Sequence, residues 1–129
     1  ITGHSLGAAL ATLVAGRLDN PDVVLYTYGS PRVGNGKWNK CQKFKHYRFR
    51  NNNDLVTRIP PAWLGFKHNG KFIYFNSNGD HKDQPGFFYM LTHWFGGIMR
   101  GILSLSFDSF SDHNINTYYK LCQHKQMNQ

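Results

Sequence analysis

The stretch Ile1-Thr2-Gly3-His4-Ser5-Leu6-Gly7-Ala8-Ala9-Leu10-Ala11 opens the chain, and its residues 3–7 fit the pattern G-x-S-x-G. In this pattern a sharp turn between a strand and a helix lifts the central serine above a β-sheet, where a base and a carbonyl carbon can both reach its hydroxyl group. Glycine is expected on both sides because a Cβ atom there would clash with neighbouring chain. The pattern predicts that Ser5 is a nucleophile.

The residues after Ser5 have the pattern of a helix that packs on a sheet. Small residues in the first turns permit a close approach, and the larger apolar residues recur on one helical face: Leu6, Leu10, Leu13, Val14 and Leu18. Only Ile1 and Thr2 precede Gly3, so little of the expected first strand is present. Because the chain has 13 glycines in 129 residues, the alternative for the motif alone is a glycine-rich turn with a buried serine.

The rest of the chain predicts an α/β fold with a mostly parallel sheet. The run 23–28 is apolar almost without interruption, which is typical of a parallel strand covered on both faces. A helix followed by such a strand is half of a βαβ unit. Further along the chain we expect a short helix over 36–44, strands over 46–50 and 71–75, and a final helix over 114–123 that is capped by Ser111 and Asp112. Between these elements we expect an irregular segment over 55–61, which ends in two prolines, and a polar loop over 76–84.

Composition indicates one domain with an apolar core. Hydrophobic residues make up 40% of the chain, and 15 Lys and Arg against 7 Asp and Glu give a formal net charge of +8. The alternating run 45–50 predicts a half-exposed strand with a solvated basic face; attraction to an anionic interface stays open, and nucleic acid is disfavoured. Cys41 and Cys122 have no metal-ligand spacing and are either a disulfide or two buried thiols.

One segment, 86–105, is unusually apolar and is rich in Phe, Trp, Leu and Ile. It also contains His93, Arg100 and several glycines. Three interpretations are open: a buried or pocket-lining helix, an element at a lipid interface, and a membrane span.

A nucleophilic serine needs an imidazole base and a carboxylate that orients it. Asp54 and Asp80 each follow a strand and an Asn-rich loop, so both are candidates, although each could be a turn aspartate bonded to its own backbone. The chain has seven histidines, and His113 is favoured because it follows both carboxylates and precedes a helix. The N-terminus of that helix should lower the pKa of His113 and keep its imidazole neutral.

The other histidines are weaker candidates for the base. His4 lies inside the turn and should not reach back to Ser5, whereas His46 and His68 are expected to be structural or solvated. His81 and His93 follow the candidate carboxylates in less defined surroundings.

Four segments in order resemble the class 3 lipases, a family with the α/β-hydrolase fold typified by fungal triacylglycerol lipases. They are 2–11, with the serine motif; 28–35, Tyr-Gly-Ser-Pro-Arg-Val-Gly-Asn; 53–61, Asn-Asp-Leu-Val-Thr-Arg-Ile-Pro-Pro; and 112–113, Asp-His. The second segment is far more specific than the serine motif. The resemblance runs over almost the whole chain, with only a loose match over 66–111.

The resemblance implies a catalytic triad of Ser5, Asp54 and His113, with the backbone N–H of Leu6 as one oxyanion-hole donor. It also implies that residues 1–129 are the C-terminal part of a single domain, and that the family's N-terminal strands, lid and second oxyanion donor are absent from this sequence. The sequence itself does not give the localisation, and the resemblance suggests secretion. Its oligomeric state is not predicted.

The activity implied is hydrolysis of carboxylic esters of lipids through an acyl-enzyme, at a lipid–water interface and without a metal or other cofactor. Phospholipase, galactolipase and short-chain esterase activity are alternatives, because the lid and much of the substrate pocket are not in the sequence. A different class of function is a non-catalytic fragment that acts as an interaction module.

Overall fold

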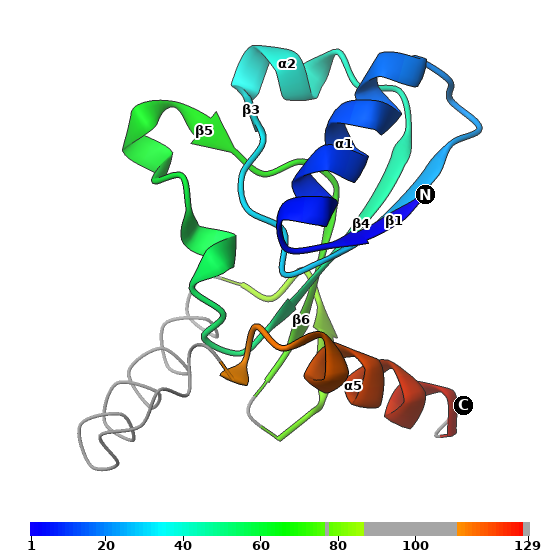
Figure 1. Cartoon of the computed structure of the whole chain (residues 1–129), viewed down its shortest axis with the longest axis vertical. Coiled ribbons are helices and arrows are strands. Elements are labelled where there is room, and N and C mark those ends of the chain that lie inside the picture. Colours follow the sequence, from blue (N-terminus) through cyan, green and yellow to red (C-terminus); the bar gives the residue numbers. More distant parts are fainter. Residues whose placement is uncertain (77, 87–110, 128–129) are drawn as a thin grey trace.

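The computed structural model of the chain describes residues 1–76, 78–86 and 111–127. Its centre is a five-stranded sheet in the order β1-β2-β4-β6-β7 (Figure 1). The parallel strands are β1 (Thr2–His4), β2 (Val24–Tyr28), β4 (Lys45–Asn51) and β6 (Lys71–Phe75), and β7 (His81–Asp83) pairs antiparallel with β6. The prediction of a mostly parallel α/β sheet is confirmed.

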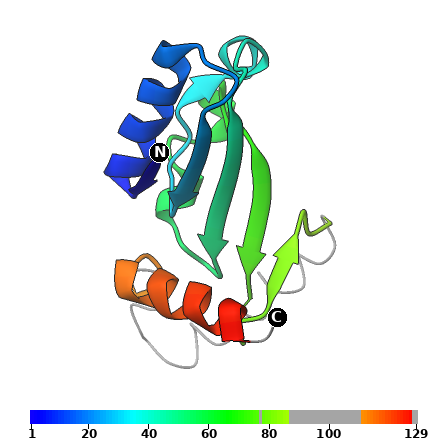
Figure 2. The ribbon, with the colours of Figure 1, turned by 90° about the vertical axis from the view of Figure 1, so that its right-hand side faces the viewer.

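Helices lie beside the sheet, and Figure 2 shows α1 and α5 next to its strands. Helix α1 (Leu6–Leu18) connects β1 to β2, and α5 (Ile115–Met127) is the last element. Smaller elements lie between the strands: α2 (Gly36–Lys40), the 3₁₀ turns η1 (Val56–Arg58) and η2 (Ala62–Leu64), and a two-stranded sheet of β3 (Gly34–Asn35) and β5 (Phe66–Lys67).

Each face of the sheet has its own apolar core. On the α1 face the buried residues are Ala11, Ala15, Leu25 and Phe44. On the α5 face they are Phe49, Ile73, Phe75 and Tyr118. The second core is aromatic, with the Phe49 ring centroid 6.0 Å from that of Phe75 and 4.9 Å from that of Tyr28.

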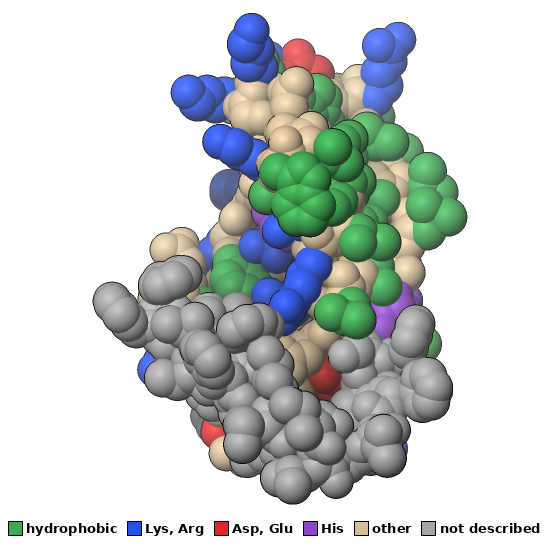
Figure 3. All heavy atoms as spheres, turned by 90° about the vertical axis from the view of Figure 1, so that its left-hand side faces the viewer, with side chains coloured by type: hydrophobic (Ala, Val, Ile, Leu, Met, Phe, Trp, Pro, Cys, Tyr) green, Lys and Arg blue, Asp and Glu red, His purple; other side chains and the backbone are tan. Residues whose placement is uncertain are grey.

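Helix α1 contacts the sheet with its small side chains. Ala8, Ala11, Thr12 and Ala15 are buried, whereas the face of larger residues predicted from the sequence is exposed, with Leu6 at 70% and Leu10 at 56% of full exposure. Short side chains let the helix backbone come close to the strands, and this leaves the leucine face pointing outward. Figure 3 shows apolar side chains gathered on one face of the molecule, next to a stripe of Lys and Arg side chains.

Strand β4 corrects the prediction of a solvated basic face. Lys45 is exposed, but His46 and Arg48 are only 6% and 8% exposed. The alternation is present, but His46 and Arg48 lie on a covered face of β4, which runs in the middle of the sheet between β2 and β6. Tyr26 of β2 departs from expectation in the other direction, because it is exposed on a strand that was predicted to be covered on both faces.

Other boundaries differ from the predictions in smaller ways. The short helix ends at Lys40 rather than 44, the polar loop over 76–84 contains β7, and the proline-rich segment 55–61 contains η1. The final helix follows Asn114, whose Oδ1 accepts from the N–H of Asn116 at 2.8 Å, so the predicted cap at Ser111 and Asp112 is wrong. Cys41 and Cys122 do not form a disulfide, and Cys41 is exposed.

The apolar segment 86–105 lies, from residue 87 on, outside the described residues. None of the helices in the described part of the chain combines the length and apolarity that a membrane span requires.

Buried His46 and half-buried His68 lead to a prediction about acid stability. Burial, helped by the charge of Arg48, lowers the pKa of His46 to about 4 and that of His68 to about 3. Between these values and the unfolded value of about 6.5 the unfolded chain binds more protons, so the free energy of unfolding should fall as the pH drops from about 6.5 to about 4. Urea unfolding across this range measures the slope. The variant His46→Gln should have a shallower slope, and an unchanged slope would contradict the assignment to His46.

Candidate active site

Ser5 sits in a strained turn between β1 and α1. Its φ is 56° and its ψ is −128°, a conformation that non-glycine residues rarely adopt. An added Cβ at Gly3 would lie 2.5 Å from the carbonyl oxygen of Gly7, which explains why glycine precedes the serine. The same explanation fails for Gly7 itself, because within the described structure a Cβ there would meet no atom within 4 Å. The expectation that both glycines avoid a clash is therefore correct only for Gly3.

The structure brings His113 into contact with Ser5. The Nε2 atom of His113 lies 2.7 Å from Ser5 Oγ, across a sequence separation of 108 residues. On the other side of the ring, Nδ1 lies 3.0 Å from both Oδ1 and Oδ2 of Asp54. A neutral imidazole with its proton on Nδ1 donates to the carboxylate and leaves Nε2 free to accept the serine proton.

Asp54 is fully buried and its carboxylate is held by three donors. The carboxylate follows β4, in the loop that precedes η1, and its exposure is 0%. The Val56 N–H donates to Oδ1 at 2.9 Å, and the Tyr118 hydroxyl donates to Oδ2 at 2.6 Å. Together with His113 Nδ1, these donors orient the carboxylate toward the imidazole.

Tyr118 links α5 to this carboxylate. Its hydroxyl also accepts from the backbone N–H of Asn51 at 2.9 Å, so it bridges the end of β4 and Asp54. Burial and then the charge of Asp54 raise the pKa of Tyr118, which keeps the phenol protonated as a donor.

Asp112 fastens the loop that carries His113. Its Oδ2 accepts from the Asn52 side chain and from the Asn53 backbone N–H, both at 3.1 Å, and its backbone oxygen accepts from Asn51 Nδ2 at 3.1 Å. Through Asp112, the loop after β4 and the loop before α5 are therefore bonded to each other next to His113.

Gly29 directly follows β2 and lies against the contact between Asp54 and His113. Its φ is +58°, and an added Cβ would be 2.7 Å from Asp54 Oδ2 and 2.9 Å from His113 Nδ1. The glycine of the Gly-Ser-Pro-Arg segment is therefore required by both backbone conformation and space.

His4 supports His113 rather than Ser5. Its Nε2 lies 2.7 Å from the backbone oxygen of His113, and the two ring centroids are 4.7 Å apart. Burial lowers the pKa of His4, and the charge of His113 lowers it further, while the bond to the His113 backbone oxygen opposes this. A neutral His4 donates its Nε2 proton to that backbone oxygen and holds the base in place.

Other candidates for the carboxylate and the base make contacts away from Ser5. Asp80 accepts from the side chain of Asn76 at 3.2 Å in a local turn, which is the alternative foreseen for it. His46 contacts the Thr27 hydroxyl at 2.8 Å, and His68 contacts the Thr57 backbone oxygen at 2.8 Å, so both are structural. His93 lies outside the described residues.

Sequence reasoning missed the supporting residues His4, Tyr118 and Asp112. Only Asp112 carried a usable signal, because it is adjacent to His113 in the Asp-His segment. Leu6, the expected oxyanion donor, is the first residue of α1, where backbone N–H groups have no partner within the helix. Across the described ranges no three His, Cys, Asp or Glu side chains are grouped to hold a metal ion.

Comparison with known proteins gives a consistent result. The model of the family Lipase (class 3) matches residues 1–63. The secreted mono- and diacylglycerol lipase 1 of Fusarium solani is 40% identical over 88 residues, which cover 64% of this chain and 26% of that protein. The chain thus spans about a quarter of this relative's length.

Solved structures resemble the chain as well. The lipase–propeptide complex of Rhizomucor miehei is 34% identical with a TM-score of 0.57, covering 64% of this chain and 30% of that one. A triacylglycerol lipase whose catalytic centre is described as a serine protease triad is 31% identical with a TM-score of 0.54, covering 64% and 35%. The chain is therefore class 3 lipase-like, and its sheet and helices form part of an α/β-hydrolase fold.

Proposed function

We propose that the protein is a serine hydrolase that cleaves carboxylic esters of lipids. The observation that carries this proposal is the continuous line of contacts from Ser5 Oγ through His113 to Asp54, on a strained turn that opens a helix. On this proposal residues 1–129 are the C-terminal part of a single α/β-hydrolase domain. The protein is secreted, as two of its relatives are described, and acts at a lipid–water interface.

The reaction proceeds through an acyl-enzyme. Ser5 Oγ attacks the acyl carbon while His113 Nε2 takes its proton, and Asp54 stabilises the imidazolium that forms. The N–H of Leu6 donates to the oxyanion of the tetrahedral intermediate. His113 then gives its proton to the departing alcohol, and a water molecule, activated by the same base, releases the carboxylic acid and restores Ser5.

Lipid esters are the favoured substrates because the relatives are described as mono- and diacylglycerol or triacylglycerol lipases. Phospholipids, galactolipids and short-chain esters are related substrates that share the same attack on an acyl carbon. The apolar segment 87–103, proposed to line the acyl pocket or to contact lipid, lies outside the described residues.

Replacement of the nucleophile tests the proposal. In its full natural length, the protein should hydrolyse p-nitrophenyl esters, and Ser5→Ala should lower kcat by about 10⁴-fold or more. Activity on short and long acyl chains, glycerolipids and phospholipids then separates lipase, esterase and phospholipase. Equal background activity in both folded proteins would instead support a non-catalytic interaction module.

Removal of the Tyr118 hydroxyl should weaken catalysis without abolishing it. Tyr118→Phe deletes one of the three donors that orient Asp54, which should lower kcat, and it leaves the carboxylate with more charge to stabilise protonated His113, which should raise the pKa of the base. We expect kcat to fall about tenfold, the acidic limb of the kcat/KM profile to move to higher pH, and stability to fall by about 1–3 kcal/mol. Tyr119→Phe is the matched control, because Tyr119 is exposed and bonds only to Gln123 among the described residues. An unchanged pH profile in Tyr118→Phe would contradict this role.

A methyl group at Gly29 should separate His113 from Asp54. We expect Gly29→Ala to lower kcat by at least about 10²-fold, because the new Cβ would occupy space at the Asp54–His113 contact and alanine disfavours the positive φ. Gly86→Ala is the control, since a Cβ there would meet no described atom within 4 Å. Steady-state kinetics on one ester measure both variants, and similar kcat values in the two would show that the contact tolerates the methyl group.

A further inference from the structure

Arg32, in the loop after β2, makes three hydrogen bonds that lie outside the line of contacts at the candidate active site. Its Nη1 atom donates to the backbone oxygens of Arg58 and Pro60, the second at 2.9 Å. Its backbone N–H donates to the carbonyl oxygen of Ile59 at 2.7 Å. One residue therefore holds three consecutive carbonyl groups, at the end of η1 and just after it.

The segment that Arg32 holds is poorly suited to a β-sheet. Proline has no backbone N–H, so neither Pro60 nor Pro61 can donate to a neighbouring strand. Partly buried carbonyl groups then need donors from elsewhere in the chain, and Arg32 supplies them. A guanidinium group suits this role because it carries several N–H donors in a rigid planar fork. No ion pair of the described residues includes Arg32, so these donors serve the backbone rather than a carboxylate.

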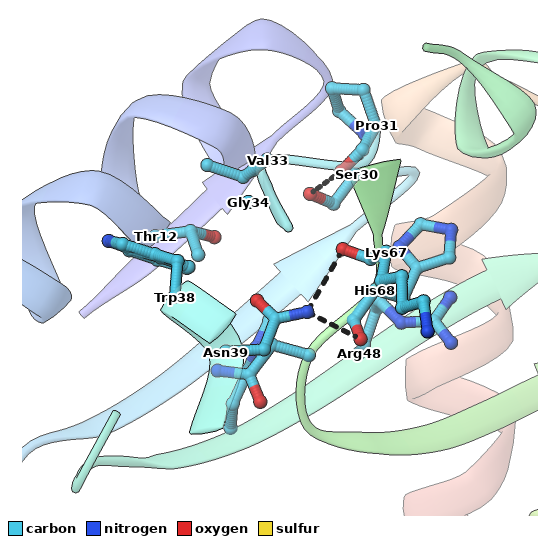
Figure 4. A pocket seen from close by; sticks show the side chains of 12 residues that line it. Thr12, Ser30, Pro31, Val33, Gly34, Trp38, Asn39, Arg48, Lys67 and His68 are labelled. Atoms are coloured by element: carbon cyan, nitrogen blue, oxygen red, sulfur yellow. Dashed lines mark hydrogen bonds between the residues drawn. The ribbon is translucent and has the colours of Figure 1, made fainter. Parts of the chain in front are cut away.

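The loop that carries Arg32 is itself fixed in place. Ser30 is only 2% exposed, and its hydroxyl group donates to the backbone oxygen of Pro31 at 3.0 Å. Figure 4 shows Ser30 and Pro31 beside a small polar recess that His68 also lines. The Nε2 atom of His68 lies 2.8 Å from the backbone oxygen of Thr57, so a second side chain holds η1. The backbone oxygens of residues 57–60 thus all have partners from other parts of the chain.

The turn η1 also holds Asp54. The Val56 N–H donates to Oδ1 of Asp54 at 2.9 Å, and the Thr57 hydroxyl donates to the backbone oxygen of Asp54 at 2.8 Å. The N–H of Arg58 closes the turn by donating to the backbone oxygen of Leu55 at 2.9 Å. Because η1 has only three residues, a shift at its end would move the Val56 N–H and change the direction of the carboxylate.

We propose that Arg32 is a positioning residue for Asp54. Arg32 fixes the end of η1, η1 fixes the Val56 N–H, and this N–H keeps the carboxylate directed at His113 Nδ1. The effect of Arg32 on catalysis rests on the proposed function of the protein. Its effect on the contact between Asp54 and His113 can be measured without any activity.

Proton NMR of the hydrogen bond between His113 and Asp54 tests this role independently of catalysis. In the protein at its full natural length, the Nδ1 proton of His113 should give a low-field signal, which is assigned by its loss in His113→Gln. In Arg32→Gln this signal should broaden and move upfield, because the looser contact lets the proton exchange with water. Arg17→Gln removes the same charge from an exposed position and should leave the signal unchanged. The same signal in Arg32→Gln and in the unaltered protein would overturn the proposal.

Steady-state kinetics on a p-nitrophenyl ester give the second readout. Arg32→Gln should lower kcat about tenfold and leave KM within about twofold, because the carboxylate is misdirected while substrate contacts are kept. If Arg32→Gln fails to fold, Arg32→Lys replaces it in both measurements; it keeps the charge but loses the planar fork, and kcat should fall about threefold.

The outcomes separate this inference from the proposed function. Equal kcat values in a folded Arg32 variant and in Arg17→Gln would overturn the role of Arg32. If the unaltered protein shows no esterase activity, the proposed function fails, and the NMR signal alone decides whether Arg32 positions Asp54.

Discussion

The contact between Asp54 and His113 is the constraint on which the rest of the described structure depends. A carboxylate with no exposure is stable only if its oxygens are fully hydrogen bonded, and here the donors come from η1, α5 and the loop before α5. These elements are separated by up to 64 residues in sequence. Gly29 must lack a side chain for the carboxylate and the imidazole to meet, so the Asp54–His113 contact also restricts which residue can follow β2.

Local patterns predicted the parts of the fold that depend on local interactions. The apolar run before Tyr28, the alternation in β4 and the Asn-Gly turn before Lys71 each indicated a strand, and each strand is present. What the patterns could not show is which face of a strand is covered. His46 and Arg48 are buried because other side chains pack over their face of β4, and the alternation of charge does not encode this packing.

The candidate site also has residues that a local pattern revealed and residues that depend on long-range contacts. The serine turn could be identified from five consecutive residues, whereas the residues alone left Asp54 and Asp80 as alternatives until the family resemblance favoured Asp54. In the structure, Asp80 is used within its own turn and Asp54 faces the imidazole. The roles of His4 and Tyr118 could not have been found, because their partners lie 109 and 64 residues away. His4 occupies a variable position of the serine motif, and Tyr118 belongs to no local motif.

Asp54 does not neutralise the arginines of β4, because both of its carboxylate oxygens already accept hydrogen bonds within the candidate site. Oδ1 of Asp54 accepts from Val56 and His113, and Oδ2 accepts from Tyr118 and His113, so both oxygens are already occupied. Of the arginines near Arg48, only Arg50 has its pKa raised by Asp54, and that effect is smaller than the lowering by burial. The carboxylate is thus committed to the imidazole, and among the described residues Arg48 stacks on the Phe72 ring and forms no ion pair.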